Sequence, residues 1–313
     1  MKVLALKGRD FISLHDWSRE ELEEVLALAQ WQKARLQQGI LDTALKGKQL
    51  GMYFAKPSTR TRLSFEVGIQ QLGGRGLFLS ADDLQLSRGE SIADTARVMS
   101  RFLHGIMIRT FAHQDVTELA RWATIPVING LTDEEHPCQV MADLLTILER
   151  FGTLEGIKLA YVGDGNNMAH SLMDGGAKFG MHVAVACPEG YKPDPARVAR
   201  AQATAARHGA LVEVLTDPAE AVAGAHVVYT DVWVSMGQER EAEARRAAFR
   251  GYQVNSALMR LAAPQAVFMH CLPAHRGEEV TAEVIDGPQS VVFDQAENRL
   301  HAQKAIMTLI MAD

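Results

Sequence analysis

The chain has 313 residues, of which 47% are hydrophobic, so it is long enough for two domains with substantial cores. Its 32 basic and 38 acidic residues give a net charge of −6, without a basic arm or a stripe of interleaved basic and aromatic residues. This balance argues against a nucleic-acid partner.

The predicted elements begin with a helix over Ser18–Gln38, in which Ser18 is the N-cap and Glu21 completes a capping box. Short apolar runs then alternate with longer amphipathic segments, which predicts βα units. The first half offers the strands Gln49–Ala55, Gly76–Leu79, Gly105–Arg109 and Pro126–Asn129. The second half offers Lys158–Gly163, His182–Ala186, Val212–Leu215, His226–Thr230, Ala266–His270 and Ser290–Phe293. Ten such strands favour an α/β fold with two domains, each a parallel-stranded sheet flanked by helices.

Two longer helices set the expected domain organisation. Pro137–Phe151 opens on a proline and is our candidate for the long helix that links the domains. The C-terminal helix, Glu297–Met311, is expected to return to the first domain. We therefore expect a first domain of residues 1–135 plus 295–313, and a second domain of residues 136–294.

The cysteine spacing and the first ten residues indicate which cellular compartment to expect. The three cysteines, Cys138, Cys187 and Cys271, form no CxxC pair and no zinc spacing, so neither a disulfide framework nor a structural metal is expected. Residues 1–10 are charged and contain no long apolar stretch. We therefore expect no signal peptide, no membrane anchor and a cytoplasmic location.

A run of hydroxyls and cations, Ser58-Thr59-Arg60-Thr61-Arg62, stands where the first strand gives way to a helix. The first N–H groups of a helix lack intrahelical partners and carry the positive end of the helix dipole, which favours a bound anion. Arginine adds a planar fork that binds phosphate oxygens bidentately. Taken alone, the run could also be a solvated helix cap with a surface charge pair, although the anion site is the favoured interpretation.

Further polar residues follow the other strands, which is where ligands bind in open α/β sheets. In the first half these are Arg109, Asn129, His136 and Gln139. In the second half they are Asp164-Gly165-Asn166-Asn167, Asp231 with Ser235-Met236-Gly237, and His270-Cys271-Leu272-Pro273. The cations and potential donors at equivalent strand ends favour an anion site in the first domain. In the second domain, the amides of Asn166 and Asn167 suit an amino-acid backbone and the carboxylate of Asp231 suits an ammonium group.

In order and spacing, these motifs resemble the aspartate/ornithine carbamoyltransferase family from about Asp10 to Met311. Ser58–Arg62 resembles the carbamoyl phosphate signature of that family, and His136-Pro137-Cys138-Gln139 resembles its second shared motif. The second-half motifs resemble the ornithine branch, because an aspartate enzyme would show proline-leucine-proline-arginine where this chain has His270–Pro273. The resemblance implies transfer of the carbamoyl group of carbamoyl phosphate to the side-chain amine of L-ornithine, giving L-citrulline and phosphate in arginine metabolism. It implies neither a metal nor an organic cofactor.

The resemblance also implies roles for individual residues. The phosphate would be held by Ser58, Thr59, Arg60 and Thr61, with Arg62 as a brace behind them. The carbamoyl oxygen would accept hydrogen bonds from Thr61, Arg109 and His136. Gln139 and the backbone carbonyls of Cys271 and Leu272 would accept hydrogen bonds from the carbamoyl NH₂, and Arg299 would approach the same group. The amine of ornithine would contact Asp231 and Cys271, and its α-amino and carboxylate end would contact Asn167, Ser235 and Met236. Family enzymes are trimers in which a loop of one subunit contributes to the site of its neighbour, and Gln85 is our candidate residue on that loop.

Several alternatives stay open on the sequence. The acceptor could be N-acetylornithine, putrescine or lysine, although contacts to an α-carboxylate favour ornithine. Gly163 and Gly165 suggest a nicotinamide-dependent oxidoreductase, but Met168 stands where the third glycine of the dinucleotide fingerprint belongs. A two-domain solute receptor would also need a phosphate site and an amino-acid site, and the absence of an export signal counts against it.

Overall fold

The computed structural model describes residues 6–313 and separates into two compact units. Unit 1 comprises the residues up to Leu145 together with Glu297–Asp313, and unit 2 comprises Thr146–Ala296. The division falls inside helix α5 (Pro137–Phe151), which therefore connects the units, whereas the sequence-based boundary precedes this helix. The expectation for residues 1–10 falls partly on residues 1–5, which lie outside the described part of the chain.

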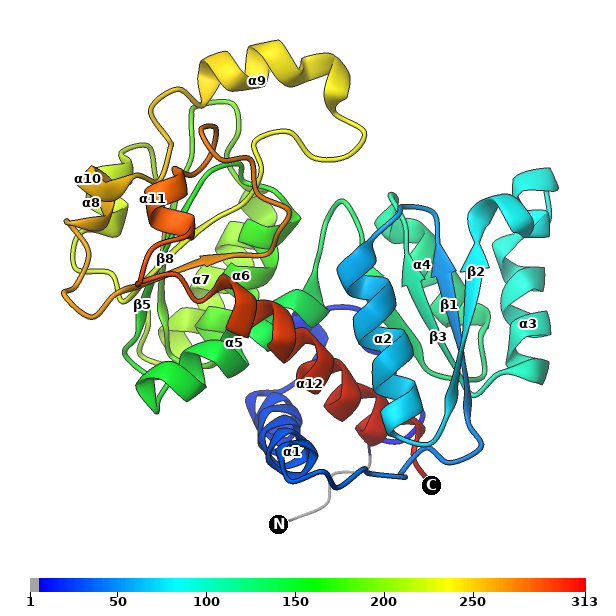
Figure 1. Cartoon of the computed structure of the whole chain (residues 1–313). Coiled ribbons are helices and arrows are strands. Elements are labelled where there is room, and N and C mark those ends of the chain that lie inside the picture. The colour runs from blue at the N-terminus through cyan, green and yellow to red at the C-terminus, as the bar shows by residue number, and fades with distance from the viewer. Residues whose placement is uncertain (1–5) are drawn as a thin grey trace. The chain divides into compact units, whose positions relative to one another are not determined.

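Unit 1 is built on a parallel sheet with the strand order β2-β1-β3-β4 (Figure 1). Its strands are β1 (Gln49–Phe54), β2 (Arg75–Ser80), β3 (Gly105–Arg109) and β4 (Val127–Leu131). The helical elements of this unit are η1 (Leu14–Asp16), α1 (Arg19–Gln37), α2 (Thr59–Gln71), η2 (Ala81–Asp83), η3 (Gln85–Arg88), α3 (Ile92–Phe102) and α4 (His113–Trp122). Helix α1 carries the predicted capping box between Ser18 and Glu21.

The two faces of this sheet are covered by different helices (Figure 1). Met99 of α3 and Val116 of α4 pack with Ile108 of β3 in one apolar cluster, while α2 lies on the opposite face. The C-terminal helix α12 (Val292–Met311) packs tightly against α2, because a Cβ placed on Gly68 would lie 3.1 Å from Cε of Met307. The predicted return of this helix to the first domain is confirmed.

Unit 2 repeats the plan with a parallel sheet in the order β7-β6-β5-β8-β9. Its strands are β5 (Lys158–Val162), β6 (His182–Ala186), β7 (Val212–Leu215), β8 (Val227–Thr230) and β9 (Val267–His270). The helical elements are α6 (Asn167–Lys178), α7 (Pro195–Arg207), α8 (Pro218–Val222), η4 (Glu239–Glu241), α9 (Ala242–Ala248), α10 (Ser256–Met259) and α11 (Ala282–Ile285). Helices α8, α10 and α11 bury the side chains of Val222, Met259 and Ile285 against one face, whereas α6 and α7 lie on the other (Figure 1).

One predicted strand, Ser290–Phe293, is wrong. Ser290 makes an isolated bridge to Phe268, and the chain turns into helix α12 at Val292. The amide of Gln295 already donates to the carbonyl of Val291, so helical hydrogen bonds replace a ladder from this point. The last helix consequently starts five residues before the predicted Glu297.

No helix within residues 6–313 is both long enough and apolar enough to span a membrane.

Candidate active site

Both sheets have a topological switch point, where consecutive connections leave toward opposite edges. In unit 1 it lies between β1 and β3, since β2 flanks β1 on one side and β4 flanks β3 on the other. In unit 2 it lies between β5 and β8. Ligands of open α/β sheets bind beyond the carboxyl ends of strands at such points. Ser58 and Arg109 mark this position in unit 1, and Asp164 and Asp231 mark it in unit 2.

The unit 1 site begins at the N-terminus of α2. Ser58 is the N-cap, and its Oγ accepts from the amide of Thr61 at 3.2 Å and donates to Thr61 Oγ1 at 3.1 Å. Arg299 of α12 donates to the same Thr61 oxygen at 2.9 Å. Because the Thr61 hydroxyl accepts both of these bonds, its own proton is available to be donated to a ligand. The structure thus brings together three residues predicted for this site.

A group of cations surrounds His136, which directly precedes α5 and is buried. Burial is the main reason that the pKa of His136 lies well below its usual 6.5, and Arg299, Arg109 and Arg60 lower it further. Lys56, a buried residue that sequence analysis did not single out, acts in the same direction. The imidazole is therefore neutral near pH 7, with one ring nitrogen that can donate a hydrogen bond and one that can accept.

This depressed pKa should be visible in the pH dependence of stability. Below about pH 6.5 the unfolded chain takes up a proton at position 136 that the folded chain excludes, so the free energy of unfolding falls as the pH falls. His136→Gln removes that uptake, and its stability should decline less steeply between about pH 6.5 and 5, by up to about 1.4 kcal/mol per pH unit. Urea unfolding of both proteins at several pH values measures the difference. Parallel curves would show that His136 is not excluded from protonation in the fold.

Gln139 on α5 is held in one amide orientation. Its Nε2 donates to Oδ1 of the buried Asp143 at 2.8 Å, one helical turn further on. Its Oε1 is buried without a protein hydrogen-bond partner. A carboxylate on one end of the amide fixes the other end as an acceptor, which suits a ligand that carries N–H groups.

Three neighbouring residues have structural roles. Arg62 pairs with Glu66 at 3.3 Å and lies 4.0 Å from the centre of the Phe78 ring, in keeping with a brace. Cys138 donates to the carbonyl of Asn129, and burial raises the pKa of its thiol to about 12. Asn129 itself donates to the backbone of Ile12 at 3.0 Å.

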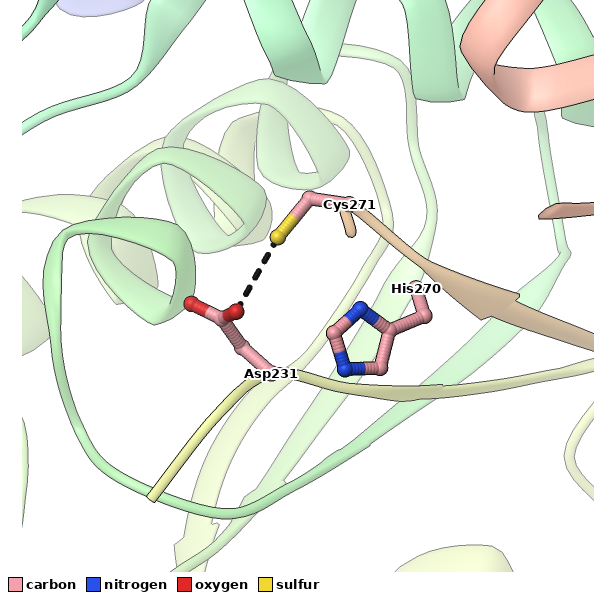
Figure 2. A group of neighbouring side chains, drawn as sticks. All are labelled: Asp231, His270 and Cys271. Carbon is pink, nitrogen blue, oxygen red and sulfur yellow. Dashed lines mark hydrogen bonds between the residues drawn. The ribbon is translucent and has the colours of Figure 1, made fainter. Parts of the chain in front are cut away.

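The unit 2 site centres on Asp231, a buried carboxylate directly after β8. Its Oδ1 accepts from Sγ of Cys271 at 3.1 Å (Figure 2). The same oxygen accepts from the amide of Val232 at 2.8 Å. Its Oδ2 accepts from Nδ2 of Asn166 at 3.1 Å. The predicted pair of Asp231 and Cys271 is therefore in direct contact.

Asn166 organises this site although our prediction named Asn167 as the ligand. The Asn166 Oδ1 caps α6 by accepting from the amide of Met168 at 3.0 Å, and it also accepts from the hydroxyl of Tyr161 at 3.2 Å. Both ends of its amide are therefore engaged within the protein. Asn167 is the first residue of α6 and is half-buried.

The turn that carries Cys271 is held from behind by a buried histidine and a buried glutamate. Leu272, at φ 60°, donates its amide to Nδ1 of His270 at 2.8 Å. That bond makes Nδ1 an acceptor, so Nε2 carries the proton and donates to Glu279 at 3.2 Å. Glu279 thus fixes the histidine tautomer that supports the Cys271–Leu272 backbone.

Asp231, His270 and Cys271 also have the residue types and proximity of a metal site, since their ligand atoms lie within 4.8 Å of one another (Figure 2). The hydrogen bonds described above account for each of them. A metal bound here would have to displace the thiol proton and the Leu272 amide.

The remaining predicted residues lie on exposed or half-buried segments. Ser235 is half-buried and Met236 is 44% exposed, in the turn that precedes η4. Gln85 is exposed at the start of η3, and Thr59 is exposed at the start of α2. No described contact joins these residues to the two clusters above.

Comparison with known proteins identifies relatives over nearly the whole chain. The family model described as "Aspartate/ornithine carbamoyltransferase, carbamoyl-P binding domain" matches residues 9–149. The model described as "Aspartate/ornithine carbamoyltransferase, Asp/Orn binding domain" matches residues 155–310.

Individual relatives are named as ornithine carbamoyltransferases. An ornithine carbamoyltransferase of Symbiobacterium thermophilum is 84% identical, covering 99% of this chain and 100% of the relative. An anabolic ornithine carbamoyltransferase of Pyrococcus furiosus is 57% identical, covering 99% of this chain and 98% of the relative. A solved structure of the ornithine carbamoyltransferase from Pyrococcus furiosus superposes with a TM-score of 0.96 at 57% identity, covering 99% of both chains.

Proposed function

This chain belongs to the aspartate/ornithine carbamoyltransferase family, and we propose that it transfers the carbamoyl group of carbamoyl phosphate to the side-chain amine of L-ornithine. The products are L-citrulline and phosphate. The anabolic name of one relative supports a place in arginine biosynthesis. The observation that carries the choice of acceptor is the buried Asp231 carboxylate in contact with the Cys271 thiol, because these groups suit an amine.

The unit 1 residues supply the electrostatics of carbamoyl transfer. Arg60 and the capped N-terminus of α2 bind the phosphate, which leaves as an anion. Arg109, the neutral His136 and the Thr61 hydroxyl donate to the carbamoyl oxygen, which gains negative charge as the carbon becomes tetrahedral. Gln139 accepts from the carbamoyl NH₂ through the oxygen that Asp143 leaves available. Arg299 holds Thr61 in place for this role.

The unit 2 residues prepare the nucleophile. An amine with a pKa near 10.4 must lose a proton before it can attack, which costs about 4 to 5 kcal/mol at pH 7. Asp231 attracts the ammonium form and aligns it, with Cys271 beside it. The amine nitrogen then bonds to the carbonyl carbon, the bond from that carbon to the phosphate oxygen breaks, and phosphate leaves with the electron pair. The ammonium loses one proton before it attacks, and the nitrogen loses a second as the tetrahedral species collapses. One of these protons leaves on the phosphate as HPO₄²⁻ and the other is released to solvent.

Acceptor choice can be tested with a panel of amines at a fixed, saturating concentration of carbamoyl phosphate. We expect kcat/KM for ornithine to exceed the values for putrescine, N-acetylornithine and lysine by at least about 100-fold. Putrescine lacks the α-carboxylate that Asn167, Ser235 and Met236 are proposed to recognise, and unmet polar contacts are costly. The readout is the carbamoylated product of each amine. Equal or better activity with another amine would show that ornithine is the wrong acceptor.

Several expectations stay predictions. We propose a homotrimer in which the exposed Gln85 reaches the site of a neighbouring subunit, and a cytoplasmic location. The contacts of Cys271 and Leu272 with the carbamoyl group, and of Thr59 with the phosphate, are proposals of the same kind.

A further inference from the structure

A buried ion pair lies beside the proposed ornithine site and has no part in the reaction described above. Nη1 of Arg245 donates to Oδ2 of Asp164 at 2.8 Å, and both side chains are buried. Asp164 follows β5, and Arg245 lies on α9. Removing both charges from water costs free energy that their attraction does not always recover, so a buried ion pair is weak evidence for a stabilising role.

Arg245 also donates hydrogen bonds to the segment between β8 and α9, residues 231–241. We call this segment the acceptor loop because it contains Asp231, Ser235 and Met236. The guanidinium donates to the carbonyl of Trp233 at 3.2 Å and to the carboxylate of Glu241 at 3.2 Å. It therefore contacts residues near both ends of the loop. One planar group holds the loop to the end of β5.

The partner of Arg245 is a second carboxylate close to Asp231. Strands β5 and β8 are neighbours, with Tyr161 opposite Tyr229, so Asp164 and Asp231 follow adjacent strand ends. Burial raises the pKa of Asp164, Arg245 opposes that rise, and Asp231 adds to it through charge repulsion. Without the guanidinium, two acidic groups would compete for one cationic amine.

We propose that Arg245 is a positioning residue for ornithine: by pairing with Asp164 and holding the acceptor loop, it makes Asp231 the carboxylate that meets the amine. This inference rests on the proposed function, since it assumes an amine acceptor at Asp231. Loss of Arg245 leaves a buried carboxylate that attracts the ammonium to the wrong place. Loss of Asp164 leaves a buried guanidinium that turns toward Asp231 and occupies it.

The test compares Arg245→Gln, Asp164→Asn and the double variant with the wild type in a steady-state citrulline assay. We expect each single substitution to raise the KM for ornithine about tenfold, while the KM for carbamoyl phosphate stays within about twofold. The double variant removes both charges, so its KM for ornithine should be lower than that of either single variant. Arg246→Gln is the matched control, because Arg246 is exposed and pairs with Glu278 on the surface. Its kinetics should match the wild type.

The outcomes separate the inference from the proposed function. A wild type that forms no citrulline overturns the function itself. An active wild type with a double variant no better than the worse single variant overturns the charge-pairing role of Arg245. If Arg245→Gln does not fold, Asp164→Asn still decides, because an unchanged KM for ornithine in that variant also overturns the inference.

Discussion

Carbamoyl phosphate is expected to bind about 100-fold more weakly when Arg60 is replaced by alanine, whereas Arg62→Ala leaves its binding within about twofold. The two arginines lie two residues apart near the N-terminus of α2. Replacing either one by alanine therefore has a similar effect on helix propensity and removes one positive charge from the same end of the helix dipole. Of these two arginines, Arg60 is the one among the cations that lower the pKa of His136. Arg62 instead pairs with Glu66 and covers Phe78.

The measurement is the KM for carbamoyl phosphate at saturating ornithine, supported by the Kd of inorganic phosphate as a competing anion. Because the phosphate contact exists in the ground state as well as in the transition state, the loss should fall mainly on KM. An equal effect of both substitutions would mean that general positive charge, and not a contact from Arg60, binds the anion.

The second large effect is expected for Asp231→Asn, which should lower kcat/KM for ornithine by about 1,000-fold while leaving the KM for carbamoyl phosphate nearly unchanged. Asparagine keeps the size of the side chain but removes the charge that attracts an ammonium group. It also turns an amide nitrogen toward one of the present donors, Asn166, Val232 or Cys271. Loss of a charge in a buried site costs several kcal/mol of transition-state binding.

Cys271→Ala is the graded comparison for this variant. The thiol is a weak donor, so its loss should reduce kcat/KM for ornithine by only about tenfold. The Asp231 carboxylate would keep its bonds from Val232 and Asn166. If Asp231→Asn turned over ornithine as efficiently as Cys271→Ala, the carboxylate could not be the principal contact of the amine.

The sequence predicted the strand ends well because the apolar runs are short and sharply bounded. Gly105–Arg109, His182–Ala186 and Val212–Leu215 have the same limits in the structure as in the prediction. Since ligand-binding residues of parallel sheets follow strands, this pattern made Ser58, Arg109, Asp231 and Cys271 candidates, and the family resemblance then suggested a role for each. The strand order, which creates the two switch points, is not encoded in local periodicity and needed the structure.

The supporting residues were harder to predict because their partners are remote in sequence. Arg245 pairs with Asp164 across 81 positions, and Arg299 meets Thr61 across 238 positions. Nothing local distinguishes Arg245 from its exposed neighbour Arg246. Glu279 could have been suspected only as an acidic residue within reach of His270. Ser290–Phe293 was misread because a brief apolar run looks alike in a strand and at the start of a helix.

Unit 2, Thr146–Ala296, is inserted in the sequence between two segments of unit 1. The ribosome delivers all of unit 2 before it delivers Arg299, so unit 2 can fold during translation while unit 1 still lacks its last helix. Arg299 is synthesised 238 residues after Thr61, so their hydrogen bond can form only after unit 2 has been translated. A nascent chain that stops after Ala296 would therefore contain all of unit 2 but would lack the last helix of unit 1. We expect carbamoyl phosphate binding to be acquired only after the acceptor unit is complete.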